Sequence, residues 1–256
     1  MSIYRIRLKR LAFIQWSRAF AIGLVAVMLA GCVYLRLLEV KNQLRDFDRF
    51  FQVEVSDQFA LKFREPVLLD EDFEYLTGFR PTRTERRGGE TIWSVDFQKL
   101  DAAGRVETPA RTLRFTMWFG ADSKLTRFAF SPLFVAIAPA SFLEASIRSM
   151  GRGAVDTDRR QLRVEPQDIP RINARLPTRR TIVDAIGEPA QRATIADGLL
   201  YVYRFRVDAQ PVSSAAAKHG VAEAKLLFDP VSDELRKMLG QFVGLRLKID
   251  YGKLTK

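Results

Sequence analysis

The hydrophobic positions that follow residue 32 have first a helical and then a strand-like spacing. Six apolar residues recur at intervals of three and four: Val33, Leu37, Val40, Leu44, Phe47 and Phe51. This spacing predicts a helix of about 19 residues with one apolar stripe. We expect the stripe to pack on the protein's own domain, although it could instead lie in a membrane interface or meet a partner helix. Alternating apolar residues at 53–63 then predict one strand, in which Ser56 and Asp57 could form a bulge.

A pattern of a short helix followed by strands occurs twice after residue 66. Asp70 can cap the first helix, which ends at Gly78, and Thr178 caps the second, which ends at Gly187. Aromatic strands follow each helix, and corresponding positions stay 108–110 residues apart through four landmarks. We therefore predict an α+β fold of two repeated units, each a short helix plus a three-stranded antiparallel sheet, preceded by an N-terminal helix and strand.

The segment between the two units has its own short elements. Residues 140–151 predict a helix that Gly151 ends, residues 161–165 a strand, and residues 169–176 a short helix. A basic cluster, formed by Arg159, Arg160 and Arg163, is expected on a solvated face or against an anionic partner. The predicted boundaries are 32–65 for the N-terminal helix and strand, 66–135 for the first unit, 136–176 for the helical connector and 177–256 for the second unit.

The first 31 residues differ in composition from the rest of the chain. They carry five basic side chains and no acidic one: Arg5, Arg7, Lys9, Arg10 and Arg18. Thirteen uncharged residues, 19–31, follow the last of these. This arrangement is typical of a secretory signal peptide, because a membrane-spanning helix needs about 20 apolar residues. An uncleaved membrane anchor, extended as far as Arg36, is the alternative.

The apolar run ends in Leu29, Ala30, Gly31 and Cys32, and these four residues resemble the lipobox of bacterial lipoproteins. The resemblance implies that the thiol of Cys32 carries a diacylglyceryl group and that cleavage falls between Gly31 and Cys32. Val33 in the next position resembles lipoproteins that are released to the outer membrane. We therefore expect a lipid-anchored envelope protein that faces the periplasm from the outer membrane, or alternatively from the inner membrane.

The second unit resembles a known family of envelope lipoproteins. Its helix near Thr178, its turn from Gly187 to Pro189, its aromatic strand 201–205 and its last hairpin with Phe228 are similar to the small outer-membrane lipoprotein of the β-barrel assembly machinery, the SmpA/OmlA-like fold. The resemblance covers about 60 residues. It implies a helix-then-three-strand fold, which also occurs in inhibitors and binding proteins.

The composition argues against several classes of chemistry. A single cysteine excludes an internal disulfide bond, and a single histidine, His219, excludes most metal sites, so we expect no metal and no cofactor. The net charge of +11 is compatible with an anionic lipid or polysaccharide, but no nucleic-acid-binding signature is present. The chain also has neither a phosphate-binding loop, nor a dinucleotide fingerprint, nor a nucleophile elbow.

Few side chains remain as candidates for a functional site. Carboxylates for acid–base chemistry occur at Asp70, Glu71 and Asp72 and at Asp156 and Asp158, although acids at a helix start usually cap it. Trp93 and Trp118 could anchor a partner, but their alternation with apolar residues favours the core. We therefore predict that the protein is not an enzyme but a binding or scaffolding protein. It would contact the membrane through a lipid on Cys32 and would bind other envelope proteins. A lipid or small-ligand carrier and a cell-wall-active enzyme are the alternatives.

Overall fold

The structure is a computed structural model that describes residues 33–152, 154–156, 161–163, 175–218, 220–242 and 245–251. Some of the sequence predictions therefore concern residues outside the described part: the lipobox with Cys32, the residues Asp158, Arg159, Arg160 and His219, and most of the helix expected at 169–176. No helix in the described ranges is both long enough and apolar enough to cross a membrane.

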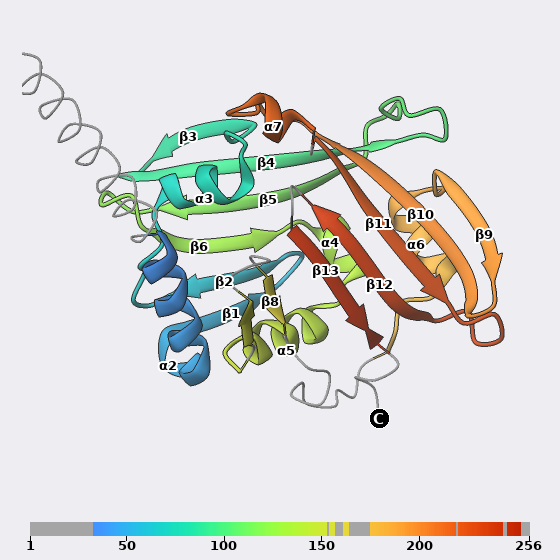
Figure 1. Cartoon of the computed structure of the whole chain (residues 1–256), viewed down its shortest axis with the longest axis horizontal. Coiled ribbons are helices and arrows are strands. Elements are labelled where there is room, and N and C mark those ends of the chain that lie inside the picture. The colour runs from blue at the N-terminus through green and yellow to red at the C-terminus, as the bar shows by residue number, and fades with distance from the viewer. Residues whose placement is uncertain are drawn as a thin grey trace, which may run out of the picture.

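One curled antiparallel sheet dominates the fold and forms a half-barrel (Figure 1). Its main path has the order β1-β2-β6-β5-β4-β10-β11-β12-β13, while β3 pairs with β4 and β9 pairs with β10. The strands are β1 (Phe51–Val55), β2 (Phe59–Phe63), β3 (Arg83–Arg87), β4 (Glu90–Leu100), β5 (Thr112–Phe119), β6 (Leu125–Phe130), β9 (Gln191–Ile195), β10 (Gly198–Val207), β11 (Val221–Phe228), β12 (Leu235–Phe242) and β13 (Leu245–Asp250). A separate hairpin consists of β7 (Ala154–Asp156) and β8 (Gln161–Arg163).

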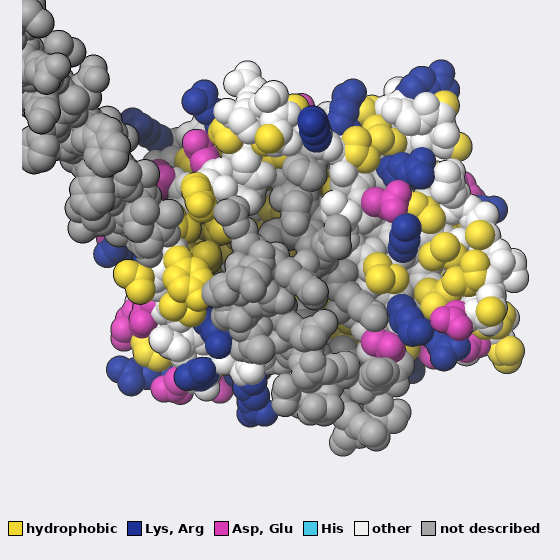
Figure 2. Space-filling view, viewed as in Figure 1, with side chains coloured by type: hydrophobic (Ala, Val, Ile, Leu, Met, Phe, Trp, Pro, Cys, Tyr) yellow, Lys and Arg dark blue, Asp and Glu magenta, His cyan; other side chains and the backbone are white. Residues whose placement is uncertain are grey.

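The helices pack against one face of this sheet, which we call the inner face. Residues 33–43 form the N-terminal helix. The other helical elements are η1 (Leu44–Asp46), α2 (Phe47–Phe50), α3 (Asp70–Thr77), α4 (Pro132–Ile137), α5 (Ala140–Met150), α6 (Arg179–Ile186) and α7 (Ser214–Ala217). Figure 2 shows hydrophobic side chains left on the surface over α3 and the N-terminal helix. The opposite side of the sheet, the outer face, carries mostly polar side chains, as is common for antiparallel sheets.

Besides a third cluster formed by Leu44, Phe47, Phe51 and Leu61, two clusters of buried side chains line the inner face. The larger one joins strand residues such as Phe97 and Tyr203 to Phe134 of α4, Phe142 of α5 and Ile182 of α6. The smaller one surrounds Trp93 and Phe119 and includes Phe73 of α3 and Leu37 and Val40 of the N-terminal helix. Burial of this apolar surface is the main force that holds the helices on the sheet.

The apolar stripe after residue 32 packs on the protein's own domain, as predicted. Val33, Leu44, Phe47 and Phe51 are buried, and the stripe also contacts the smaller core cluster. Helical elements cover 33–50, close to the predicted length, but the helix is not continuous. Residues 44–46 form the 3-10 helix η1, Asp46 leaves the helical conformation with φ −115° and ψ 59°, and the chain enters β1 at Phe51.

The single strand expected at 53–63 is also wrong, because the chain forms the hairpin β1–β2. Val55 lies opposite Phe59, so the polar residues between them make a turn rather than a bulge. The Ser56 hydroxyl donates to the Asp57 carboxylate at 2.9 Å, and the Ser56 N–H donates to the Gln58 carbonyl at 3.0 Å. Serine and aspartate favour such turns because their side chains bond to nearby groups.

The α+β class is confirmed, but the description as three-stranded units is wrong in two respects. The segment 66–135 contains one more strand than predicted, β3, and the segment 177–256 contains two more, β9 and β13. Both segments belong to one sheet, joined by the β4–β10 pair. The residues of β3 and β9 are all exposed, so neither strand has the alternation that would reveal it in the sequence. The helix expected at 140–151 is confirmed as α5, while α4 was not predicted.

Candidate functional site

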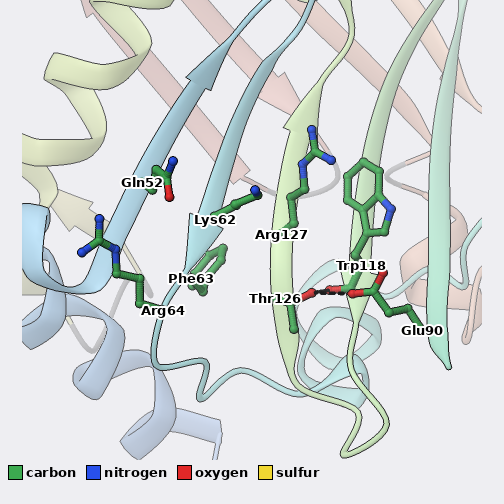
Figure 3. A pocket seen from close by; sticks show the side chains of 8 residues that line it. All are labelled: Gln52, Lys62, Phe63, Arg64, Glu90, Trp118, Thr126 and Arg127. Carbon is green, nitrogen blue, oxygen red and sulfur yellow. Dashed lines mark hydrogen bonds between the residues drawn. The ribbon is translucent and has the colours of Figure 1, made fainter. Parts of the chain in front are cut away.

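A row of polar and aromatic side chains crosses the outer face over four neighbouring strands. Gln52 of β1 lies opposite Lys62 of β2, Lys62 opposite Arg127 of β6, and Arg127 opposite Trp118 of β5. Because side chains directly opposite in a sheet point to the same face, these four residues stand side by side. We call them the outer ledge (Figure 3).

A pocket of about 370 Å³ opens on the outer ledge. It is lined by the four ledge residues together with Phe63, Arg64, Glu90 and Thr126. Figure 3 shows the ledge side chains rising from the strands, with Arg127 standing between Lys62 and the Trp118 ring. The pocket is therefore a charged recess on the solvated side of the sheet, rather than a cavity in the apolar core.

The charges of the outer ledge are incompletely balanced. Lys62 and Arg127 are like charges directly opposite each other, an arrangement that destabilises a sheet. The carboxylate of Glu54 bridges them, with distances of 2.6 Å to Lys62 Nζ and 3.4 Å to Arg127 Nη2. The hydrogen bond from Lys62 holds the pKa of Glu54 below its usual value. Within the described structure the buried Nε of Arg127 has no hydrogen-bond partner.

The guanidinium of Arg127 lies 4.6 Å from the centre of the Trp118 ring, a cation–π distance. Stacking on the indole holds the guanidinium in place, so its donors are preorganised. Two adjacent cations with a fixed guanidinium can receive an anionic group such as a carboxylate or a phosphate.

The two tryptophans predicted as core residues have different positions. Trp93 is buried against Phe119, with ring centres 4.9 Å apart, so the prediction is confirmed for this residue. The prediction is wrong for Trp118, because Met117 and Phe119 take the inward positions of β5 and leave Trp118 partly exposed on the outer face. The alternative role of Trp118 as a contact for a partner remains a prediction.

The acidic cluster at the start of α3 has a structural role. The cap position is Leu69 rather than Asp70, and the carboxylate of Asp72 accepts the Leu69 N–H at 2.8 Å. Asp72 is fully buried and also accepts a hydrogen bond from Nε of Arg36 at 2.7 Å. Glu71 is exposed and lies 3.3 Å from Arg36. Asp72 therefore caps the start of α3 and also holds the N-terminal helix in place through Arg36.

The remaining predicted candidates are not gathered into one site by the described structure. Asp156 lies in β7 and Arg163 in β8. No group of three or more His, Cys, Asp or Glu residues in the described ranges could hold a metal ion. The predicted cap of α6 is confirmed, because Thr178 Oγ1 accepts the Thr181 N–H at 3.2 Å. Gly78 ends α3 in the left-handed conformation, with φ 73° and ψ 12°, as predicted.

A buried ionic cluster at the end of α6 was missed in the sequence. Lys99 of β4 is fully buried and pairs with Glu107, which also accepts a hydrogen bond from Arg111 at 2.8 Å. The Lys99 ammonium is 5.7 Å from the ring centre of Tyr203, whose hydroxyl donates to the Gly187 carbonyl at 3.1 Å. Burial raises the pKa of this hydroxyl. A cation near the C-terminal end of a helix is favourable, so the cluster joins the 101–111 segment to α6.

No family model, no curated protein and no solved structure matches this chain.

Proposed function

We propose that the protein is a lipid-anchored protein of the cell envelope that binds or scaffolds other envelope components at the periplasmic face of the outer membrane. In this proposal residues 1–31 are removed as a signal peptide, and Cys32 carries the lipid. The observation that carries it is the order of a basic segment, an uncharged run and the Leu29-Ala30-Gly31-Cys32 motif, directly before a helix that packs on the domain. Acyl chains contribute about 0.8 kcal/mol of membrane affinity for each buried CH₂ group.

The outer ledge supports a binding role for this protein. Lys62, Arg127 and Trp118 offer a fixed pair of cations beside an aromatic ring, on the face of the sheet opposite to the described helices. Carboxylate and phosphate groups are abundant on envelope polymers and lipids, and these are the groups that such a pair of cations attracts. We therefore place the binding surface of the proposed scaffold at the outer ledge.

We further propose that the two halves of the exported chain are copies of one unit. The strands β4 and β10 pair so that Gln98 lies opposite Arg206, which is 108 residues further along the chain. Leu100 lies opposite Arg204, and the Asp208 N–H donates to the Asp96 carbonyl at 2.8 Å. The separation of 108 residues agrees with the 108–110-residue offset between corresponding positions of the two units. A local two-fold axis between duplicated units would have this property.

The helix ends support the same interpretation. The carbonyl of Gly78, at the end of α3, accepts the Val212 N–H at 2.8 Å from the other half, and a Cβ at Gly78 would lie 2.8 Å from the side chain of Ala216. Gly187 at the end of α6 lies in turn against Arg111 of the first half. Each helix end thus rests on the connecting segment of the other half. The resemblance of the second unit to the SmpA/OmlA-like fold is part of this proposal.

Lipidation is tested by expressing the full chain with labelled palmitate in a bacterium that has two membranes. We expect label in the wild type, no label in Cys32→Ala, and a precursor that accumulates when the lipoprotein signal peptidase is inhibited. Fractionation of the two membranes then tests the outer-membrane placement. An unlabelled chain with an unprocessed mass would contradict the proposal and indicate an uncleaved anchor.

Binding at the outer ledge is tested with two soluble probes, a peptidoglycan fragment that carries free carboxylates and inorganic phosphate. We expect a saturable change in tryptophan fluorescence that is lost when Lys62 and Arg127 are both replaced by Gln. Arg180→Gln is the matched control, because this arginine is exposed on α6. Equal responses of the wild type and the double variant would show that the ledge is not the binding surface, whatever the result for lipidation.

A further inference from the structure

We propose that the protein lies directly on the lipid surface in one orientation, through a patch formed by Tyr34 and Leu35 of the N-terminal helix and Tyr75 and Leu76 of α3. We call these four residues the membrane-facing patch. This inference rests on the membrane attachment in the proposed function, and it holds for a lipid on Cys32 as well as for an uncleaved anchor. The occupant of the patch is the interface of a phospholipid bilayer.

The first argument is that no spacer separates the attachment point from the folded domain. Val33 directly follows Cys32, is only 9% exposed and already lies in the N-terminal helix. Leu37 and Val40 of this helix pack on the smaller core cluster, and Gln43 Nε2 donates to the Glu65 carbonyl at 2.9 Å. A membrane anchor that ends at residue 32 therefore holds the domain at the bilayer without a flexible linker.

The second argument is that the two helices which carry the patch are fixed to each other. Arg36 lies one turn from Val33 and donates from Nε to the buried carboxylate of Asp72 at 2.7 Å. The same guanidinium lies 3.3 Å from Glu71. Because these acids lie in the first turn of α3, the ion pair brings that helix to the beginning of the N-terminal helix. The ion pair thus holds the first turn of α3 beside the start of the N-terminal helix, close to the attachment point.

The third argument is the chemistry of the exposed side chains. Leu35 is 64% and Tyr75 57% exposed, and Tyr34 and Leu76 are also exposed. Figure 2 shows hydrophobic side chains on this surface, over α3 and the N-terminal helix. Leucine and tyrosine at the level of the headgroups are typical of interfacial contacts, because the aliphatic chain enters the acyl region while the phenol stays hydrated. Solvent exposure of these residues is unfavourable, and a bilayer held at residue 32 removes it.

This orientation has a consequence for the outer ledge. The N-terminal helix and α3 pack on the inner face of the sheet, whereas Lys62, Arg127 and Trp118 stand on the outer face. Docking through the membrane-facing patch therefore leaves the ledge open to partners.

The test uses the full chain in vesicles of phosphatidylethanolamine and phosphatidylglycerol. Cys32 is the only cysteine, so an introduced cysteine is the only free thiol when Cys32 is acylated. An environment-sensitive fluorophore is attached to Leu35→Cys, to Leu76→Cys and, as a control, to Val231→Cys. Val231 is 94% exposed in the turn between β11 and β12. We expect blue-shifted emission and several-fold stronger quenching by a lipid-bound nitroxide at 35 and 76 than at 231.

The outcomes separate this inference from the proposed function. Equal quenching at the three positions, with palmitate present on Cys32, would overturn the docking and leave the anchor intact. A chain that does not associate with the vesicles would overturn both. Uptake of the thiol label by the wild type would show that Cys32 is free. The measurement is then repeated in a Cys32→Ser background. In that background, lipid contact at positions 35 and 76 still supports docking, and the absence of lipid contact refutes docking. All three labelled positions are exposed, and circular dichroism of each variant checks that the fold is kept.

Discussion

The buried ion pair of Lys99 and Glu107 gives the sharpest prediction about stability. The Lys99 side chain is fully buried, whereas Glu107 keeps a small exposed fraction and also contacts Arg111. We expect Glu107→Ala to strand the Lys99 ammonium in the protein interior. The reverse change, Lys99→Met, removes the buried charge, keeps a side chain of similar length and leaves Glu107 paired with Arg111.

The expected magnitudes follow from the cost of an unpaired buried charge. Removing one partner of a buried pair typically costs about 3–5 kcal/mol, whereas replacing the charge by an apolar side chain of similar volume is often close to neutral. The ring of Tyr203 at 5.7 Å remains as a weak partner for the ammonium. We therefore expect Glu107→Ala to lower the free energy of unfolding by about 3 kcal/mol and Lys99→Met by about 1 kcal/mol or less.

The measurement is urea unfolding of the full chain in detergent micelles, followed by circular dichroism. The matched control is Asp184→Ala, which removes an exposed carboxylate 3.9 Å from Arg180 and should cost less than about 0.5 kcal/mol. The double variant Lys99→Met/Glu107→Ala should be more stable than Glu107→Ala alone, because no charge is then stranded. The reasoning is refuted if Lys99→Met costs as much as Glu107→Ala, or if the double variant is the least stable of the three.

Three further predictions concern other contacts of the fold. Arg36→Met removes the cation that pairs with the buried carboxylate of Asp72. We expect the free energy of unfolding to fall by about 2 kcal/mol and hydrogen exchange in the N-terminal helix to become faster. Unchanged exchange would contradict this prediction. Gly187→Ala should lower the free energy of unfolding by about 1–3 kcal/mol, because φ is 76° and the new methyl would lie 2.8 Å from Arg111 Nη1. At Gly88 nothing lies within 4 Å of the new methyl, so the same change there should lower the free energy of unfolding by less in the same unfolding assay. Burial raises the pKa of Glu223, but the hydrogen bonds from Arg204 and Lys225 lower it by more, so that the pKa lies below 4.5. The ionised carboxylate therefore stabilises the fold above about pH 4.5, and this stabilisation is lost as the pH falls through the lower pKa of the folded state. Glu223→Gln should therefore be less stable than the wild type at neutral pH and approach it in acid, and a constant difference across the pH range would disprove the assignment.

The elements with strong apolar periodicity could be predicted from the sequence, and those without it could not. The N-terminal helix and α5 show a helical spacing of buried residues, and the ends of α3 and α6 carry glycine in the expected places. By contrast, β3 and β9 are exposed on every residue, so they pair through backbone groups that leave no trace in the side-chain pattern. The turn at Ser56 was missed because the alternation of apolar residues continues on both sides of it, with Val53 and Val55 before the turn and Phe59 and Leu61 after it.

The candidate site was harder to predict, because it depends on which strands are neighbours. Trp118 alternates with apolar residues, as a core residue would, and only the position of Met117 on the inner face assigns Trp118 to the outer one. Lys62 and Arg127 are far apart in the chain and meet only because β2 pairs with β6. No local signal in the sequence encodes that pairing.

The order of the strands also explains why the two halves depend on each other. The larger core cluster takes Phe97 and Leu113 from the first half and Tyr203 and Ile186 from the second. The β4–β10 pair therefore joins the strands of both halves into one sheet with a single inner face, and helices from both halves pack on that face. A half-sheet with one short helix could not bury this apolar surface alone. The helix-ending glycines Gly78 and Gly187 also contact the opposite half, so the helix ends and the shared core both make the two halves depend on each other.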